Sequence, residues 1–210
     1  MIALLNVETV AFTLTGYPVS YIELVATFFG LLSVYLATKP NIWTWPTGIL
    51  NEIGFFLLFF QVELYADMLL QCIFFIVTVY GWVHWKSQER SRRSIETIGC
   101  KKFAALLAAV AIAAVAAGFL MLRLHIWFPS LFTEPAAYPF IDSFVMSASV
   151  AAIILLARKA LESWLLWILV DIICIGLFMA RGINLVAAEY LLFLLMASYG
   201  YYNWRRQRVL

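Results

Sequence analysis

The chain has 210 residues, of which 65% are hydrophobic and only 12% are charged, and its formal net charge is +2. A soluble domain carries about a quarter of its residues as charges, so this composition excludes an ordinary soluble protein and predicts an all-α integral membrane protein. The three cysteines lie far apart without metal-ligand spacing, and the basic clusters are short. We therefore expect no metal, no cofactor and no nucleic-acid partner.

Apolar runs separated by charged residues or by Pro and Gly predict seven membrane-spanning helices. In chain order they cover residues 20–38, 42–60, 65–85, 103–124, 140–157, 163–180 and 183–203. The first twelve residues, MIALLNVETVAF, are too short to span a bilayer and are expected to lie in its interface.

The orientation follows from one strongly polar segment, residues 86–102, which carries six of the 14 lysines and arginines. By the positive-inside rule this segment is cytoplasmic. Seven crossings then place six further basic residues on the same side and leave only Arg123 and Arg181 outside. The prediction is a multi-pass protein in the lipid bilayer, with its N-terminus outside and its C-terminus in the cytoplasm.

An internal repeat without gaps relates the first three spans to the last three. Shifting the chain by 119 residues aligns residues 21–85 with 140–204, and 12 of the 65 positions are identical. Charges of like sign and several aromatic residues also coincide, which is not expected from chance apolar similarity. We predict one transmembrane transporter domain over 1–210, with repeat one at 20–85, a linker helix at 103–124 and repeat two at 140–204. The plan is 3+1+3, with parallel repeats around a central substrate cavity.

Two carboxyl groups lie near mid-membrane at matching positions of the repeat, Glu52 in the second span and Asp171 in the sixth. An ionised side chain at that depth is costly and commonly marks a ligand or ion pathway. One interpretation is a water-accessible cavity whose acidic groups favour a cationic or hydroxyl-bearing solute. The other is a structural role, in which each carboxyl group is protonated or bonded to a neighbouring helix.

Tryptophans share the helix faces of these two acids. Trp45 precedes Glu52 by seven residues, and Trp164 and Trp167 precede Asp171 by seven and four. Their indole faces are suited to stacking on a flat cationic ring. Further candidates for ligand contact, with interhelical hydrogen bonds as the alternative, are Asn51, Gln71, Glu189 and Tyr190. The other tryptophans lie nearer the predicted boundaries and are expected in the aromatic belt: Trp43, Trp82, Trp85, Trp127 and Trp204.

Several segments of the chain resemble the PnuC family of vitamin transporters. They are NIWTWPTGILN in the second span, QVELYADMLLQ running into YGWVHW in the third, RKALESWLLW opening the sixth and AAEYLLF in the seventh. The resemblance covers nearly all of the chain after Ser20 and preserves the 3+1+3 order. It implies a bacterial inner-membrane protein that passes nicotinamide riboside by facilitated diffusion with alternating access, which feeds NAD synthesis after phosphorylation by a cytoplasmic kinase.

The same resemblance implies a homotrimer and a substrate site lined by Trp45, Asn51, Gln71, Trp164, Trp167, Glu189 and Tyr190. Asp171 stands where the family would lead us to expect an amide, and Glu52 is an unusual second charge. These two acids leave the identity of the transported vitamin undecided. Thiamine is the alternative substrate because its ring is also cationic. Riboflavin is neutral and fits the acidic pair less well, and deoxynucleosides are carried by other relatives of the fold.

A membrane enzyme or a proton-coupled carrier, in which Glu52 and Asp171 titrate, is the competing hypothesis. Against an enzyme, the sequence has no HExxH motif, no nucleophile paired with a base and no phosphate-binding glycine loop. Against proton coupling, no chain of polar residues runs through the fourth span. A scaffold without a solute does not explain two carboxyl groups at mid-depth.

Overall fold

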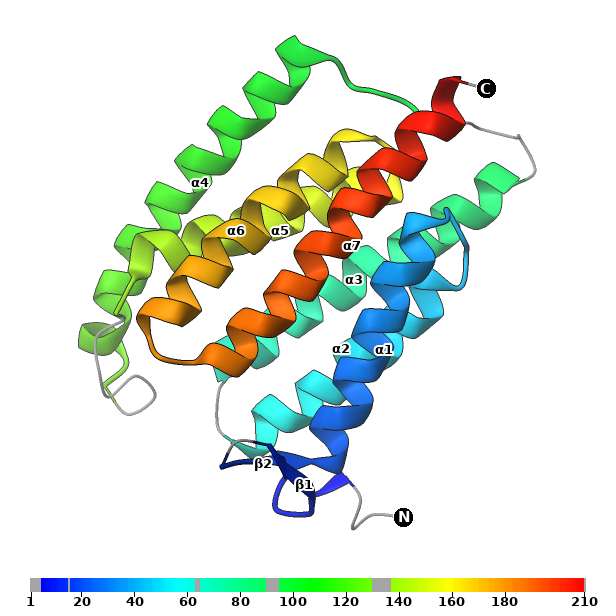
Figure 1. The fold of residues 1–210 in the computed structure, drawn as a ribbon. Helices are drawn as coiled ribbons and strands as arrows, with labels where there is room; N and C mark the ends of the chain where they lie inside the picture. The colour runs from blue at the N-terminus through cyan, green and yellow to red at the C-terminus, as the bar shows by residue number, and fades with distance from the viewer. Residues whose placement is uncertain (1–4, 15, 63–64, 90–94, 130–136, 210) are drawn as a thin grey trace. The chain divides into compact units, whose positions relative to one another are not determined.

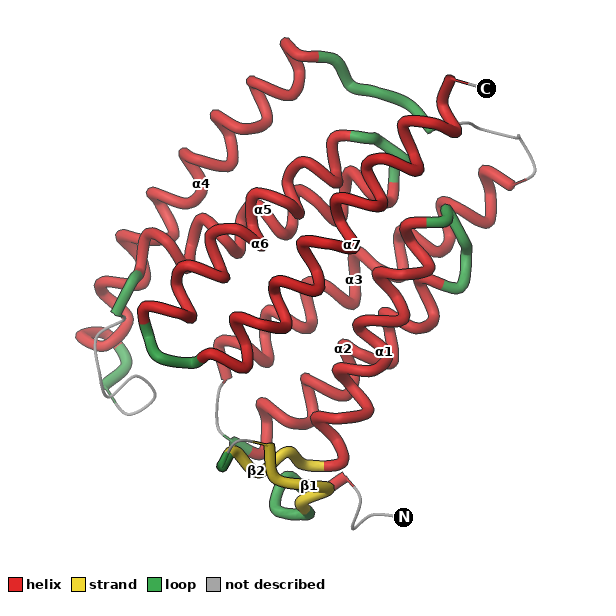
Figure 2. The backbone as a smooth tube through the Cα atoms, viewed as in Figure 1, coloured by secondary structure: helices red, strands yellow, loops and turns green. Residues whose placement is uncertain are grey.

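The structure is a computed structural model that describes residues 5–14, 16–62, 65–89, 95–129 and 137–209. Within these ranges the chain forms one two-stranded hairpin and seven helices (Figures 1 and 2). The elements are β1 (Val10–Leu14), β2 (Tyr17–Ser20), α1 (Tyr21–Thr38), α2 (Thr44–Gln61), α3 (Tyr65–Glu89), α4 (Cys100–Trp127), α5 (Pro139–Ala157), α6 (Glu162–Ala180) and α7 (Asn184–Val209).

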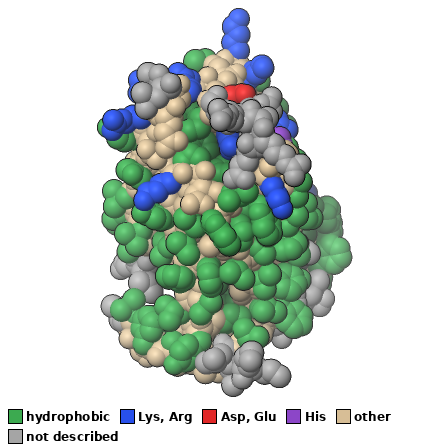
Figure 3. Space-filling model, turned by 90° about the vertical axis from the view of Figure 1, so that its right-hand side faces the viewer, with side chains coloured by type: hydrophobic (Ala, Val, Ile, Leu, Met, Phe, Trp, Pro, Cys, Tyr) green, Lys and Arg blue, Asp and Glu red, His purple; other side chains and the backbone are tan. Residues whose placement is uncertain are grey.

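The helices have the composition of membrane spans. Four of them, α1, α4, α5 and α6, are long and apolar enough to cross a bilayer, with mean hydropathies of 1.6, 2.6, 2.1 and 2.2. Large apolar side chains point outward, among them Ile112 (71% exposed) and Ile76 (68% exposed). Figure 3 shows hydrophobic side chains over most of the face that it draws. The predicted class, an all-α membrane protein with seven helices, is confirmed.

The N-terminal residues form part of a hairpin, and their predicted place in the membrane interface stays a prediction. Strands β1 and β2 pair antiparallel, and Gly16 at the turn adopts a φ of 90°, which favours glycine. Gln61, the last residue of α2, holds the residues that precede the hairpin. Its Oε1 accepts from the Val7 N–H (3.0 Å), and its Nε2 donates to the Leu5 carbonyl (2.8 Å). The N-terminal segment is thereby fastened to the end of α2.

The chain divides into two compact units, described here one at a time. Unit 1 contains β1, β2, α1, α2, α3 and residues 199–210, and unit 2 contains residues 95–198. The linker helix α4 therefore belongs to unit 2, where it packs against α5. Gly118 of α4 allows this close approach, because a Cβ at that position would lie 2.3 Å from the Phe140 ring of α5.

Small residues join α1 to α2 in unit 1. A Cβ at Gly54 would lie 2.7 Å from the Ala26 Cβ, so the two backbones approach closely there. Ser33 and Thr44 exchange side-chain-to-carbonyl hydrogen bonds of 2.8 Å in both directions. Such pairing satisfies hydroxyl groups inside an apolar environment and is typical of membrane helix packing.

Two tryptophans of unit 1 correct the aromatic-belt prediction. Trp204 is fully buried and donates its indole N–H to the Ala37 carbonyl at 2.9 Å, beside a bond from Asn203 Nδ2 to the Thr38 carbonyl at 2.8 Å. Trp85 is 2% exposed, with its ring centroid 6.2 Å from that of Trp204. These side chains fill the space between helix ends. Trp43, Trp82 and Trp127 are exposed, and for them the aromatic belt stays a prediction.

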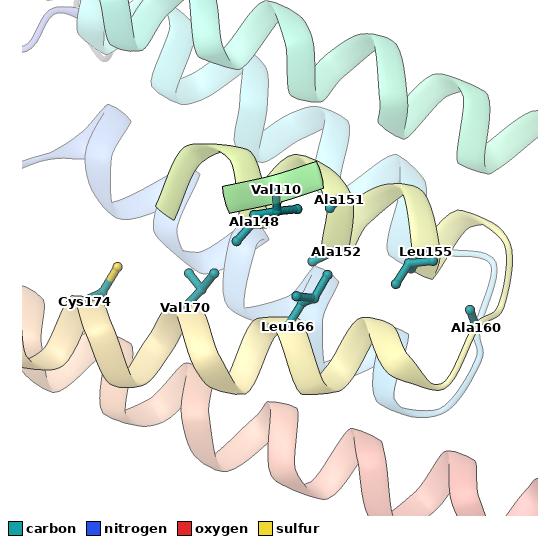
Figure 4. Close-up of a cluster of buried hydrophobic side chains, with 9 residues drawn as sticks. All are labelled: Val110, Ala148, Ala151, Ala152, Leu155, Ala160, Leu166, Val170 and Cys174. Carbon is teal, nitrogen blue, oxygen red and sulfur yellow. The ribbon is translucent and has the colours of Figure 1, made fainter. Parts of the chain in front are cut away.

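The core of unit 2 is a cluster of small and branched apolar residues between α4, α5 and α6 (Figure 4). Its members are Val110, Ala148, Ala151, Ala152, Leu155, Ala160, Leu166, Val170 and Cys174. Alanines on α5 let the neighbouring helices approach closely, which is the usual way that membrane helices gain packing contacts.

The segment before α4 is fastened to the α5–α6 connection. Glu96 donates its N–H to the Lys159 carbonyl (3.0 Å) and accepts at its own carbonyl from the Leu161 N–H (2.9 Å). The buried Glu162 carboxylate, in the first turn of α6, accepts from the Ile98 and Gly99 N–H groups at 3.0 and 3.3 Å. The start of α4 thus has a fixed position on unit 2.

Helix bounds in the two repeats follow the offset found in the sequence. Adding 119 to the bounds of α1, α2 and α3 gives 140–157, 163–180 and 184–208, within one residue of α5, α6 and α7. The helix ends match in detail, since the Asn41 N–H bonds to the Leu36 carbonyl and the Ala160 N–H to that of Leu155. The helix bounds thus share the offset, and the repeat with its domain bounds stays a prediction.

Candidate functional site

Trp45 is built into unit 1 by the shape of α3. A Cβ at Gly81 would lie 2.3 Å from the Trp45 ring, so only glycine leaves room for the indole at this point. The ring is 2% exposed and meets Trp85 edge-on at a centroid distance of 5.3 Å. Its indole Nε1 is buried and has no hydrogen-bond partner within the described residues.

Glu52 lies two turns further along the same face of α2. It is 6% exposed, and one carboxyl oxygen accepts a short hydrogen bond from the Thr78 hydroxyl of α3. The other oxygen, Oε2, is buried and unpaired in the part of the chain that the structure describes. Buried polar atoms are nearly always hydrogen-bonded, so the Trp45 donor and this acceptor are a pair of groups that a polar ligand or water could satisfy.

Asn51 and Gln71 differ in how they are held. Asn51 Nδ2 donates to the Ala26 carbonyl of α1 at 2.9 Å, and its amide fills the space above Gly30. This is the interhelical hydrogen bond that the sequence left open as the alternative. Gln71 is partly buried on α3. Ligand contact by either residue stays a prediction.

In unit 2, Asp171 is 2% exposed on α6, and its Oδ2 atom has no hydrogen-bond partner among the described residues. Trp164, two turns earlier on the same helix, is 1% exposed. Each unit therefore carries the same combination, a buried indole followed seven residues later by a buried carboxyl group with an unpaired oxygen. The predicted cavity around these groups stays a prediction.

An aromatic cluster accompanies Trp164 and Asp171 in unit 2. Tyr190 of α7 stacks on Phe178 of α6, with centroids 5.5 Å apart and planes 14° apart, and its hydroxyl interacts with the Cys174 thiol. Trp167 and Tyr190 both pack against the core cluster. Glu189, next to Tyr190 in sequence, is partly buried. The structure thus brings Trp167 and Tyr190 onto one core.

Three residues of these clusters were missed from sequence. Thr78 lies seven residues after Gln71, and this spacing alone could have placed it on the same face of the helix. Phe178 was hidden among other apolar residues. Cys174, which lies beside Tyr190, had no metal-ligand spacing in the sequence to distinguish it. An apolar span does not reveal which of its members touch a neighbouring polar group.

An open hollow on α4 does not coincide with any predicted site residue. Its lining is mostly apolar and comes from Phe119, Leu120, Leu122, Arg123, Ile126 and Trp127. Exposed apolar surface on a membrane span is the normal lipid-facing condition. The hollow also lacks convergent polar groups, so the buried acids and indoles are the better candidate site.

Comparison with known proteins identifies the family. The family model for the nicotinamide mononucleotide transporter matches residues 20–206. The chain is 32% identical over 209 residues to the nicotinamide riboside transporter PnuC of Escherichia coli, covering 90% of this chain and 87% of that one. It is 25% identical over 198 residues to the riboflavin/roseoflavin transporter RibM of Streptomyces davaonensis, covering 92% and 89%.

A solved structure shares the fold. The crystal structure of the vitamin B3 transporter PnuC matches with a TM-score of 0.67 at 20% sequence identity, covering 90% of this chain and 82% of that chain. The match in fold agrees with the seven helices and their apolar composition. This chain therefore belongs to the nicotinamide mononucleotide transporter family of membrane proteins.

Proposed function

We propose that this protein transports nicotinamide riboside across the bacterial inner membrane by facilitated diffusion. The observation that carries the proposal is the 32% identity with the Escherichia coli nicotinamide riboside transporter over 90% of the chain. A cytoplasmic kinase that phosphorylates the riboside would trap it inside, so no ion gradient is needed to drive uptake.

The chemistry of the candidate site suits this substrate. Nicotinamide riboside carries a cationic pyridinium ring and a ribose with hydroxyl groups. Trp45, Trp164 and Trp167 supply indole faces, each able to contribute about 1 to 2 kcal/mol to a desolvated cation. The unpaired oxygens of Glu52 and Asp171 are acceptors for the ribose hydroxyls or a counter-charge to the ring.

Transport requires the site to open alternately to the two sides. In transporters built from repeats, this comes from movement of one bundle of helices relative to the other. Assembly as a homotrimer, with one pathway in each protomer, is part of the proposal and rests on the family resemblance.

The arrangement of charges within each unit supports an orientation with the N-terminus outside and the C-terminus in the cytoplasm. In unit 1 the basic residues lie just after the end of α1 and within the C-terminal ends of α3 and α7. Hydrogen bonds and ring contacts join these helix ends. In unit 2 they lie at the start of α4 and the end of α5, beside the Glu96 bridge. These basic residues are Lys39, Lys86, Lys101, Lys102, Arg158, Lys159, Arg205, Arg206 and Arg208.

Riboflavin is the second candidate substrate, because the relative RibM is named as a riboflavin and roseoflavin transporter and covers 92% of this chain. Thiamine remains a third, since its cationic ring suits the same acids and indoles. The buried carboxyl groups favour the two cations over neutral riboflavin, because an uncompensated acid in an apolar site is costly.

Ligand-dependent thermal stabilisation of the purified protein tests the choice. At a concentration 100 times the dissociation constant, a bound vitamin should add about 2.7 kcal/mol to the stability of the folded protein. We expect the largest shift with nicotinamide riboside, a smaller one in Asp171→Asn, and an unchanged one in Glu8→Gln, which neutralises an exposed acid of the N-terminal segment. A shift with riboflavin or thiamine alone would contradict the proposed substrate.

A further inference from the structure

The connection between α6 and α7 consists of only residues 181–183 and has a fixed backbone. Gly182 adopts a φ of 73°, its N–H bonds to the Met179 carbonyl at 3.0 Å, and the Ile183 N–H bonds to the Phe178 carbonyl at 2.9 Å. This double hydrogen-bond pattern is the Schellman motif that commonly ends a helix. The backbone of Arg181, immediately before this glycine, is therefore held in a well-defined position.

The Arg181 side chain connects the end of α6 to the start of α5. Its guanidinium lies 3.2 Å from Asp142 Oδ2 and 4.9 Å from the centroid of the Tyr138 ring. Tyr138 and Asp142 are themselves joined, because the Asp142 N–H donates to the Tyr138 carbonyl at 2.9 Å. Arg181 thus contacts the Asp142 carboxylate and the Tyr138 ring, both of which lie at the start of α5.

The same guanidinium approaches the aromatic cluster of the candidate site. It lies 6.0 Å from the centroid of the Phe178 ring, and Phe178 stacks on Tyr190 at 5.5 Å. Cations are attracted to aromatic faces within about 6 Å. The contacts therefore run in series from Asp142 through Arg181 and Phe178 to Tyr190, all within unit 2.

We propose that Arg181 is a positioning residue for substrate binding, which holds Phe178 against Tyr190 and so sets the orientation of the Tyr190 ring in the site. The proposal rests on the proposed function, because Tyr190 must contact the substrate for its orientation to matter. The Arg181 and Asp142 side chains are 29% and 44% exposed, so their ion pair adds little to the stability of the fold. Its role in binding can therefore be measured on folded variants.

The sign of the effect separates positioning from simple electrostatics. Arg181 is a cation, and the substrate carries a positive ring. If Arg181 acted only through its charge, its removal would relieve repulsion and increase affinity. Positioning predicts the opposite, a loss of affinity when Arg181 is removed.

The matched control is Arg123→Ala. Arg123 is the other basic residue predicted outside, it is exposed near the end of α4, and it makes no described contact with the aromatic cluster. Arg181→Ala should weaken the binding of nicotinamide riboside by about three- to tenfold, as expected for residues coupled through a packed network. Arg123→Ala should leave the dissociation constant unchanged.

A double-mutant cycle separates positioning from a purely structural role, because it compares the loss of affinity caused by Arg181→Ala with and without the Phe178 ring. In a Phe178→Leu background, Arg181→Ala should cause no further loss, because the ring through which Arg181 acts is already gone. Asp142→Asn, which releases Arg181 without removing it, should weaken binding in the same direction and serves as the second variant if Arg181→Ala does not fold. Dissociation constants come from titration of the purified proteins, with unfolding midpoints measured without ligand.

Unchanged or tighter binding by a folded Arg181→Ala protein, or equal losses in the presence and absence of Phe178, would overturn the positioning role while leaving the proposed substrate intact. Absence of riboside binding by the unmodified protein would instead overturn the proposed function. In that case the same variants are titrated with the vitamin that does bind, and the predicted loss with Arg181→Ala still decides whether Arg181 positions the site.

Discussion

Replacing Gly81 by alanine tests the packing that holds Trp45 in the candidate site. The new Cβ would lie 2.3, 2.4 and 2.7 Å from three carbons of the indole. Trp45 is 2% exposed and is backed edge-on by Trp85, so the ring has little room to move away. Either α3 must shift away from α2 or Trp45 must leave its position.

Two opposing effects decide the magnitude. Alanine is a better helix former than glycine by about 1 kcal/mol, which favours the variant. Overpacking of a well-packed core typically costs about 1 to 3 kcal/mol and occasionally more. Because the closest contact is roughly 1.2 to 1.7 Å shorter than an ordinary carbon–carbon contact, we expect the upper end of this range and a net destabilisation of about 2 kcal/mol. For a protein of this size that is a fall of roughly 4 to 8 °C in the unfolding midpoint.

The assay is thermal unfolding of the detergent-solubilised protein, with Gly176→Ala as the matched control. Gly176 lies inside α6, and a Cβ there would meet nothing within 4 Å, so its replacement should stabilise the protein by up to about 1 kcal/mol. Gly81→Ala should also weaken riboside binding, because Trp45 is displaced. A Gly81→Ala protein as stable as Gly176→Ala would refute the packing that we describe.

Three further substitutions test other contacts. Trp204→Phe removes the indole N–H that bonds to the Ala37 carbonyl and should lower the stability by about 1 to 3 kcal/mol in thermal unfolding, because a buried carbonyl loses its partner; an unchanged midpoint would argue against this bond. Glu162→Ala should cost a similar amount and make the segment before α4 more accessible to protease, whereas equal cleavage of both proteins would exclude this fastening role. Thr78→Val removes the hydroxyl that donates to Glu52, and titration should show a larger change in riboside affinity than in the unfolding midpoint. A change in the midpoint alone would indicate that Glu52 is purely structural.

The membrane spans could be predicted from sequence because their length is set by the bilayer. The predicted span 140–157 compares with Pro139–Ala157 in the structure, and 163–180 with Glu162–Ala180. Apolar runs bounded by charges carry this information directly. The hairpin was not predicted, although exposed apolar residues alternate at Val10, Phe12 and Leu14, because so short a strand depends on its partner for stability.

The position of a tryptophan along a predicted span did not show whether its side chain is buried. Trp85 and Trp204 lie near predicted boundaries, which favoured the aromatic belt, yet both are buried between helix ends. Their equivalence under the 119-residue repeat was the signal available in the sequence. Likewise, the spacing of Trp45 and Glu52 identified a shared helix face, but the contacts with Gly81 and Thr78 depend on how α3 packs and could not be read from α2 alone.

The hydrogen bonds that hold the start of the linker helix α4 were also not predicted from the sequence. Residues 86–102 were interpreted only as a basic cytoplasmic loop, whereas Glu96 bridges to the α5–α6 connection and Glu162 accepts from the backbone at Gly99. Each contact uses backbone groups of the segment before α4, bonded to the backbone at 159–161 or to the Glu162 carboxylate more than 60 residues away. Backbone groups are common to all residues, so the sequence pattern does not show where these bonds form. The charge of this segment leads to a prediction for its side of the membrane and carries no information about what the segment is bonded to.

Uptake of radiolabelled nicotinamide riboside into proteoliposomes tests the central claim most directly. A facilitator should bring the internal concentration to the external value at the same rate with and without a collapsed proton gradient, and Asp171→Asn should reduce that rate. Accumulation above the external concentration that disappears with the proton gradient, or no uptake above protein-free vesicles, would contradict the account.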